Sequence, residues 1–168
     1  MNSLFTHFED FVKEEDLFKP DESILLAISG GVDSVILAHL LKLKNAKFAL
    51  AHCNFKLRAE ESDEDELFVR NLALKLGVNL YVKQFETEKT ANDKKLSNQM
   101  AARELRYEWL DELLAQKKYN WLATAHHLND NIETLIFNLA MGCGIRGLHG
   151  IQAKNTENKI IRPLLFAT

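Results

Sequence analysis

The stretch Ser29-Gly30-Gly31-Val32-Asp33-Ser34 lies between a short apolar run, Ser23 to Ile28, and a segment with helical spacing, Val32 to Leu43. The apolar run predicts a strand buried on both faces, and the two glycines allow a sharp turn into the helix. In such a turn successive backbone N–H groups face one point, and the helix N-terminus adds its own N–H groups. The stretch therefore predicts an anion-binding loop.

The side chains of this loop favour a nucleotide over a bare phosphate. The hydroxyls of Ser29 and Ser34 can donate to phosphate oxygens. Asp33 is unfavourable beside an anion unless it holds Mg²⁺ that bridges the phosphates. The alternative is a glycine turn in which Asp33 only caps the helix. No G-K-[ST] follows a five-residue gap, so the loop is not a Walker A motif. We interpret Ser29 to Ser34 as the binding site for ATP with Mg²⁺.

Outward from this loop, apolar runs alternate with helical patterns. We expect strands at 47–52, 80–83, 121–125 and 159–162, helices at 60–76, 97–117 and 129–141, and loops at 86–95 and 142–158. Residues 1–20 predict a helix packed on a domain formed by residues 21–168. The fold class is α/β, a Rossmann-like parallel sheet with helices on both faces. Ligands of such sheets bind beyond the carboxyl ends of the strands, here after Ile28, His52 and Ala125.

Composition sets the general class of protein. The chain has 168 residues, 46% of them hydrophobic and 27% charged, with a formal net charge of -3. These values are typical of a globular domain and identify no partner. Cys53 and Cys143 form no C-x-x-C pair, no basic and apolar leader begins the chain, and no apolar run approaches ~20 residues. We expect a cytoplasmic protein with reduced thiols and no membrane segment.

Two stretches supply cationic candidates. Lys56 and Arg58 follow the second expected strand, which places them near the same sheet edge as the loop. Arg103 and Arg106 lie one turn apart on one face of the helix at 97–117, with Tyr107 beside them. An exposed charged loop and an exposed helical pair are the simpler interpretations of these two patterns.

A third stretch follows the strand at 121–125. His126, Asp130 and Glu133 share one face of a helix start, where the two carboxylates could hold Mg²⁺ or bind an ammonium group. Zinc is a competing ligand, through His126, His127 and Asp130, but no cysteine completes the set. Residues 142–147 satisfy G-x-G-x-x-G, yet they follow a helix and not a strand, so we interpret them as an accidental match.

The hexapeptide resembles the PP-loop of the ATP pyrophosphatase superfamily. With HCNFKLRAEES, AARELRY, LATAHHLNDNIET, GCGIRGLHGI and IIRPLL in order, the chain is similar to the N-terminal catalytic domain of the bacterial tRNA(Ile)-lysidine synthase family. Phe55 and Asn129 depart from that pattern, where the family often has His and Asp. The resemblance implies an adenine nucleotide alpha hydrolase-like fold and a ligase that splits ATP into AMP and pyrophosphate.

The same resemblance implies substrates and roles. The wobble cytidine of a tRNA(Ile) with a CAU anticodon would be adenylated and then attacked by free L-lysine. Asp33 would hold Mg²⁺, and Arg106 with Arg103 would offset phosphate charge or position the cytidine. Asp130 and Glu133 would bind the lysine ammonium or, for Asp130, the metal. His126 would orient the intermediate, and Lys56 and Arg58 would contact tRNA.

Two competing functions are also compatible with parts of this sequence. A tRNA 2-thiocytidine synthetase would share the loop but would need a cysteine pair, and a non-catalytic adenine-nucleotide sensor would share the fold. The oligomeric state is open, and a homodimer is one possibility. The mild acidity and the last residues, IRPLLFAT, lead us to expect a fragment that ends before C-terminal tRNA-binding parts.

Overall fold

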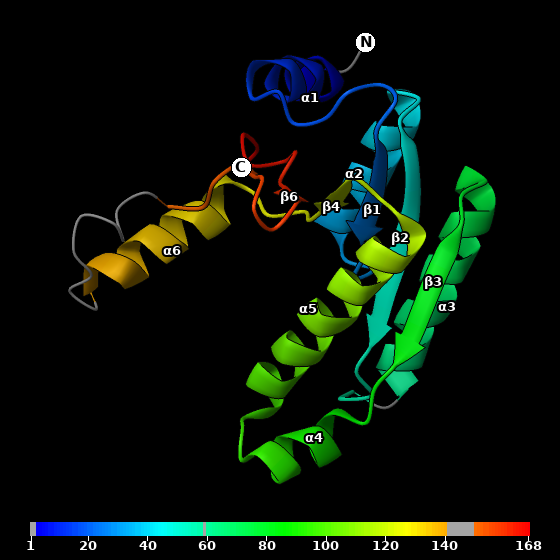
Figure 1. Cartoon of the computed structure of the whole chain (residues 1–168), viewed down its shortest axis with the longest axis vertical. Coiled ribbons are helices and arrows are strands. Elements are labelled where there is room, and N and C mark those ends of the chain that lie inside the picture. The colour runs from blue at the N-terminus through cyan, green and yellow to red at the C-terminus, as the bar shows by residue number, and fades with distance from the viewer. Residues whose placement is uncertain (1–2, 59, 141–149) are drawn as a thin grey trace.

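The computed structural model describes residues 3–58, 60–140 and 150–168, apart from the side chains of residues 134, 135 and 137–140 (Figure 1). The helices are α1 (Ser3–Glu14), α2 (Val32–Leu43), α3 (Glu60–Leu76), α4 (Thr87–Lys94), α5 (Asn98–Lys117) and α6 (Leu128–Ala140). The strands are β1 (Ser23–Ala27), β2 (Lys47–Asn54), β3 (Leu80–Gln84), β4 (Trp121–Ala123), β5 (Lys154–Asn155) and β6 (Ile160–Ile161).

The strands form one sheet in the order β3-β2-β1-β4-β6-β5, and all neighbours are parallel except the antiparallel pair β5 and β6. In the centre, Leu25 of β1 lies opposite Ala49 of β2 and Leu122 of β4. The chain builds the sheet outward from β1 to β3 and then returns to the other side of β1 with β4. The switch point between β1 and β4 is therefore where a ligand is expected.

Alternate residues of β1 point into two cores on the two faces of the sheet. Leu25 packs with Leu110, Leu113 and Leu114 of α5, while Ile24 and Leu26 pack with buried residues of α1, α2 and α3. Figure 1 shows α5 crossing one face of the sheet and α2 behind the strands. The apolar run of β1 is continuous because both of its faces are covered. The predicted Rossmann-like α/β class with helices on both faces is confirmed.

Two predicted loops were wrong in part. Residues 86–95 were predicted to be a loop but contain α4, whose Thr87 and Ala91 are buried and which ends at Lys95 in the left-handed region. Residues 142–158 were also predicted to be a loop, yet Lys154–Asn155 forms the antiparallel edge strand β5, so the sheet is not wholly parallel. The G-x-G-x-x-G match at 142–147 lies outside the described residues.

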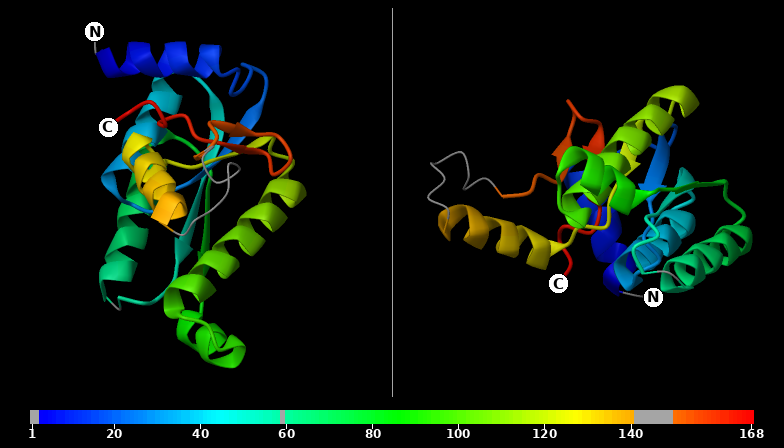
Figure 2. Two further views of the ribbon diagram at one scale, coloured as in Figure 1. Left: turned by 90° about the vertical axis from the view of Figure 1, so that its left-hand side faces the viewer. Right: turned by 90° about the horizontal axis from the view of Figure 1, so that it is seen from below.

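Helix α6 differs from the other helices in its setting. Figures 1 and 2 both show it extending away from the sheet, and its exposed residues include Ile132, Glu133 and Ile136. Across the described part of the chain, none of the helices combines the length and the apolar character that a bilayer crossing requires.

Candidate active site

A cavity of about 840 Å³ lies at the carboxyl ends of β1, β2 and β4. The loops after these three strands and the first half of α5 form its walls. This volume falls in the range of small-molecule sites, and the position matches the switch point of the sheet. The cavity is therefore the candidate active site.

The loop after β1 forms one wall of the cavity. Gly30 has a φ of 96°, which L residues with a side chain rarely adopt, so the turn needs glycine. The N–H of Gly31 donates to Ser29 Oγ at 3.2 Å, and Ser34 Oγ donates to the Gly31 carbonyl oxygen at 2.8 Å. Gly31 is the N-cap of α2 and no side chain makes a capping bond there. The alternative role of Asp33 as a helix cap therefore finds no support.

A buried histidine holds this loop to the neighbouring strand. His52 is 3% exposed, and its Nδ1 lies 2.9 Å from the carbonyl oxygen of Ile28, whose N–H donates to the carbonyl oxygen of Ala51. The end of β1 is thereby fixed against β2 by two bonds. The glycine turn starts from a rigid point, which favours a preorganised anion site.

Arg103 and Arg106 of α5 line the same cavity as the loop. The Arg106 guanidinium lies 5.2 Å from the centre of the Phe55 ring, and that of Arg103 lies 5.1 Å from the centre of the Tyr107 ring. Among residues 3–58, 60–140 and 150–168, no carboxylate forms an ion pair with either arginine. Both positive charges therefore remain available to an anionic ligand.

The loop after β4 supplies a neutral histidine. Thr124 Oγ1 lies 2.8 Å from His126 Nδ1. Burial lowers the pKa of His126 below its ordinary 6.5, and the positive charges of Arg162, Arg103 and Arg106 lower it further against the opposing effect of Asp130. Because its imidazole is uncharged at neutral pH, His126 can orient a ligand by hydrogen bonding without adding charge.

His127, the residue after His126, contacts two carboxylates of the site. Its Nε2 lies 3.8 Å from Asp33 Oδ2, and its Nδ1 lies 3.6 Å from Asp130 Oδ2. The same Asp130 oxygen accepts the backbone N–H of His127 at 2.9 Å, which is half of a capping box at the start of α6. His127 thus connects the loops after β1 and β4.

Asp33 and Asp130 are the two predicted ligands of Mg²⁺, and their positions differ in how well they suit the ion. Asp33 stands exposed at the cavity, beside the phosphate-type loop, with the oxygen ligands that Mg²⁺ prefers. Asp130 and Asp33 lie near opposite nitrogens of the His127 ring. Within the described residues no group of three His, Cys, Asp or Glu side chains could hold a metal ion. Asp33 therefore fits a Mg²⁺ that keeps waters and phosphate oxygens as its other ligands, which is the usual arrangement.

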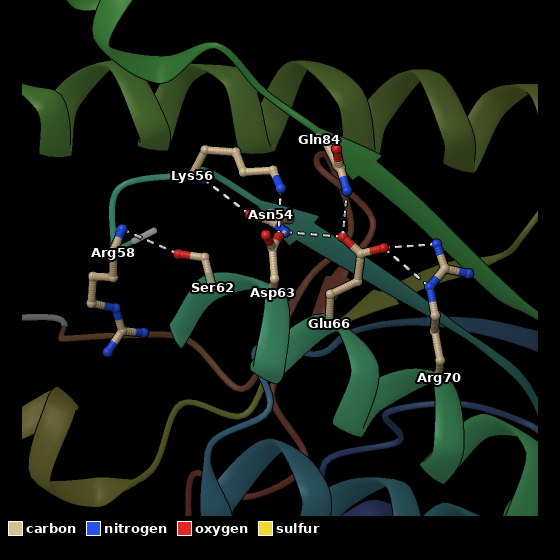
Figure 3. Close-up of polar contacts among 8 residues, drawn as sticks. All are labelled: Asn54, Lys56, Arg58, Ser62, Asp63, Glu66, Arg70 and Gln84. Atoms are coloured by element: carbon tan, nitrogen blue, oxygen red, sulfur yellow. Dashed lines mark hydrogen bonds and ion pairs between the residues drawn. The ribbon is translucent and has the colours of Figure 1, made fainter. Parts of the chain in front are cut away.

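The cationic residues after β2 are engaged in their own network (Figure 3). Lys56 Nζ lies 2.5 Å from Asp63 Oδ1, and Arg58 Nη2 lies 3.2 Å from Asp65 Oδ2. Figure 3 shows Asn54 in the middle of this network, where its amide donates to Asp63 and to Glu66 at 2.9 Å each. Lys56 points into this network and does not line the cavity, whereas Arg58 does.

The structure brings together most of the residues that the sequence singled out. The predicted residues that line the cavity are Ser29, Gly31, Asp33, Ser34, Arg58, Arg103, Arg106, His126 and Asp130. Those outside the lining are Gly30 and Val32, which lie in the loop itself, Lys56, and Glu133, which is exposed on α6. Sequence reasoning gave no role to Phe55 or Thr124. In the sequence, Phe55 is recognisable as an aromatic residue inside a charged loop, and Thr124 as a hydroxyl two residues before His126.

The strand order, the glycine loop and the cavity define a nucleotide-binding α/β domain. The profile of the PP-loop domain family matches residues 2–168, and the chain belongs to this family. The tRNA(Ile)-lysidine synthase of Bacteroides thetaiotaomicron is 46% identical over 155 residues, which are 92% of this chain and 36% of the relative. That of Chlorobaculum tepidum is 40% identical over 98% of this chain and 50% of the relative. The chain spans about a third to a half of the length of these curated relatives.

Solved structures agree on the fold. The U34-tRNA thiolase NcsA from Methanococcus maripaludis superposes with a TM-score of 0.77 over 99% of this chain and 61% of that chain, at 18% identity. The NH₃-dependent NAD synthetase from Campylobacter jejuni superposes with a TM-score of 0.63 over 100% of this chain and 69% of that chain, at 17% identity. At these identities the likeness shows the fold alone, and it confirms the predicted adenine nucleotide alpha hydrolase-like class.

Proposed function

We propose that this chain is the catalytic domain of a tRNA(Ile)-lysidine synthase. It would use ATP to activate the wobble cytidine of a tRNA(Ile) with a CAU anticodon, and would join L-lysine to C2 of that base in the cytoplasm. The observation that carries the proposal is a single cavity lined by residues of the PP-loop and by Arg103 and Arg106. The 46% and 40% identical lysidine synthases support the choice of substrates.

In the first step the C2 oxygen of the cytidine attacks the α-phosphorus of ATP, and the bond to pyrophosphate breaks. The N–H groups of the glycine turn and the hydroxyls of Ser29 and Ser34 would hold the departing pyrophosphate, the Gly31 N–H and the Ser34 hydroxyl exchanging their bonds within the loop for bonds to phosphate oxygens. Arg106, which lines the same cavity, would offset charge on the α-phosphate. Asp33 would hold Mg²⁺, which when bound neutralises phosphate charge. A cavity lined by both sets of donors suits a reacting phosphate.

In the second step the ε-amine of lysine attacks C2, and AMP leaves as the C2–O bond breaks. The bound ammonium gives one proton to Asp130 or to water before the attack, the attacking nitrogen gives a second proton to water afterwards, and the product is lysidine. Asp130, which lines the cavity, would bind the lysine ammonium before attack, whereas Glu133 lies one turn further along α6 and outside the lining. His126, neutral and held by Thr124, would orient the adenylated base.

The test supplies the chain with α-labelled ATP, Mg²⁺, L-lysine and a tRNA(Ile) transcript at low ionic strength. We expect tRNA-dependent formation of AMP and pyrophosphate, and a low yield of lysidine in the digested tRNA. Asp33→Asn should reduce pyrophosphate release by at least about 100-fold. The variant lacks the carboxylate that would hold Mg²⁺, so the phosphate charge would no longer be neutralised by the metal. Glu64→Gln, an exposed carboxylate on α3, is the matched control and should behave as wild type. ADP and inorganic phosphate as products would overturn the proposal.

The main competing function is thiolation of tRNA, because NcsA shares this fold. Cys53 lies on the cavity wall, where a sulfur carrier would be needed. Burial raises its pKa to about 12, although the charges of Arg106 and Lys83 oppose the shift. A thiol with that pKa is a poor nucleophile at neutral pH. This observation favours lysine ligation over sulfur transfer by Cys53.

A further inference from the structure

We propose that Phe55 is a positioning residue for Arg106, a role that rests on the proposed adenylation reaction. The aromatic ring holds the guanidinium at the cavity wall without neutralising it. Phe55 follows β2 directly and lines the cavity, and the Arg106 guanidinium lies 5.2 Å from the centre of its ring.

The cationic side chains at and near the cavity are of two kinds: those paired with a carboxylate and those that contact an aromatic ring. Arg58 pairs with Glu61 and Asp65, and Lys56 pairs with Asp63. Arg106 is different, since its described contact is with a ring and no ion pair to it occurs in the described residues. An ion pair would offset its charge and occupy its N–H donors. An aromatic face attracts the cation through its quadrupole and leaves those donors for phosphate or base oxygens.

The ring that holds Arg106 is itself fixed. Phe55 stacks on Phe85 with ring centres 5.4 Å apart and an interplanar angle of 19°, and Phe85 meets Trp109 edge to face at 6.2 Å. Trp109 lies one turn beyond Arg106 on α5. The aromatic cluster Phe55, Phe85 and Trp109 therefore connects the end of β2 to the helix that carries Arg106. Movement of the guanidinium would break its contact with a ring that is itself packed in place.

In the part of the chain that the structure describes, no hydrogen bond or ion pair to the Arg106 side chain competes with its contact to the Phe55 ring. The Cys53 thiol stays protonated because burial raises its pKa to about 12, so it carries no negative charge beside the arginine. Lys83 lies 5.3 Å from the centre of the Phe85 ring, and burial lowers the pKa of His126, so neither side chain offers Arg106 a negative partner. Among the described residues, the Phe55 ring is therefore the contact by which the guanidinium is held.

The test measures tRNA-dependent pyrophosphate release by wild type and by Phe55→Leu, which keeps an apolar side chain but removes the ring. A cation–π contact of ordinary strength predicts a loss of kcat of roughly 3- to 30-fold with little change in KM for ATP. Phe55→Tyr keeps the ring and should retain most of the wild-type rate. Absence of pyrophosphate release by wild type would refute the proposed function, whereas equal rates for wild type and Phe55→Leu would refute only the role of Phe55.

A double-mutant cycle separates positioning from general packing. In an Arg106→Leu background, Phe55→Leu should cause no further loss, because the group it positions is gone. Arg103→Leu is the matched control background, since Arg103 rests on Tyr107, and there Phe55→Leu should keep its full effect. A further loss of the same size in the Arg106→Leu background would show that Phe55 acts only by packing and would overturn the proposal.

Discussion

At the scale of single residues, Cys53 reports on the environment inside the cavity. Burial raises its pKa to about 12. Iodoacetamide reacts with thiolates, so alkylation of folded protein at pH 8 should be at least about tenfold slower than alkylation of the same residue in urea. The experiment uses a Cys143→Ser background, so that Cys53 is the one thiol counted by mass spectrometry. Equal rates in the folded and unfolded protein would contradict the assigned pKa.

A second prediction for Cys53 follows from its cationic neighbours. Arg106 and Lys83 both lower the pKa of the thiol against the larger effect of burial. Removing the charge in Arg106→Leu should therefore raise that pKa further and slow alkylation of Cys53 below the wild-type rate. The measurement is the pH dependence of iodoacetamide reaction between pH 8 and 10. Faster alkylation of the variant would show that Arg106 shields Cys53 mainly by covering it.

At the scale of elements, Glu66 stabilises the junction of β2, β3 and α3. It is 7% exposed and accepts hydrogen bonds from Asn54, Gln84 and Arg70 (Figure 3). Glu66→Ala leaves these donors without their acceptor, so we expect a loss of about 1–3 kcal/mol in the free energy of unfolding at pH 7. Glu64 is exposed and lies two residues away, so Glu64→Ala is the control. This substitution should change the free energy of unfolding by less than about 0.5 kcal/mol.

The pH dependence of this loss has a definite sign. Burial alone would raise the pKa of Glu66, but the hydrogen bonds from Asn54, Gln84 and Arg70 outweigh it and hold the pKa below the ordinary 4.5. The stabilising contribution is therefore complete above pH 4.5 and declines as the pH falls through the lowered pKa. Urea denaturation at pH 7 and near pH 3 should show a smaller difference between wild type and Glu66→Ala at the lower pH. A constant difference would mean that the carboxylate charge is not involved.

The elements also show what a sequence can predict. The helix at 60–76 and the strand at 47–52 were expected close to their observed bounds, because burial on one or both faces leaves an apolar pattern. Helix α4 leaves no such pattern, since only Thr87 and Ala91 are buried in TEKTANDK. Its position depends on a bond from Thr87 Oγ1 to the carbonyl oxygen of Phe55, 32 residues earlier. Contacts of that kind cannot be deduced from local spacing.

The candidate site was predictable to a similar extent. Asp33, Arg106 and His126 were expected together because parallel strands end at one edge and helix faces follow from spacing. The side-chain partners were not predictable. Lys56 turns to Asp63, and the ring of His127 lies between Asp33 and Asp130, since the nearest opposite charge depends on tertiary contacts.

At the scale of the whole molecule, charge predicts how tRNA would bind. The chain has 21 basic and 24 acidic residues, and Lys56 and Arg58 are already paired with carboxylates. We therefore expect the chain to contact fewer than about five phosphates of the tRNA. The logarithm of the affinity for tRNA should then fall with the logarithm of the salt concentration with a slope smaller than about 4. Fluorescence titration of tRNA(Ile) between 50 and 200 mM KCl measures the slope. A value near that of six or more phosphate contacts would reveal a basic surface that this charge balance does not predict.

The position of β1 in the sheet also has a consequence during protein synthesis. One edge of β1 pairs with β2, which follows soon after it, but the other edge pairs with β4, and Ser23 and Asn120 at that junction are 97 residues apart. At ribosomal elongation rates of about 5–20 residues per second, the edge of Ser23–Ala27 waits roughly 5–20 s for its partner. An apolar strand with an uncovered edge is prone to pair with other chains. The nascent protein is therefore most exposed to aggregation, and most dependent on chaperones, just before its nucleotide site closes.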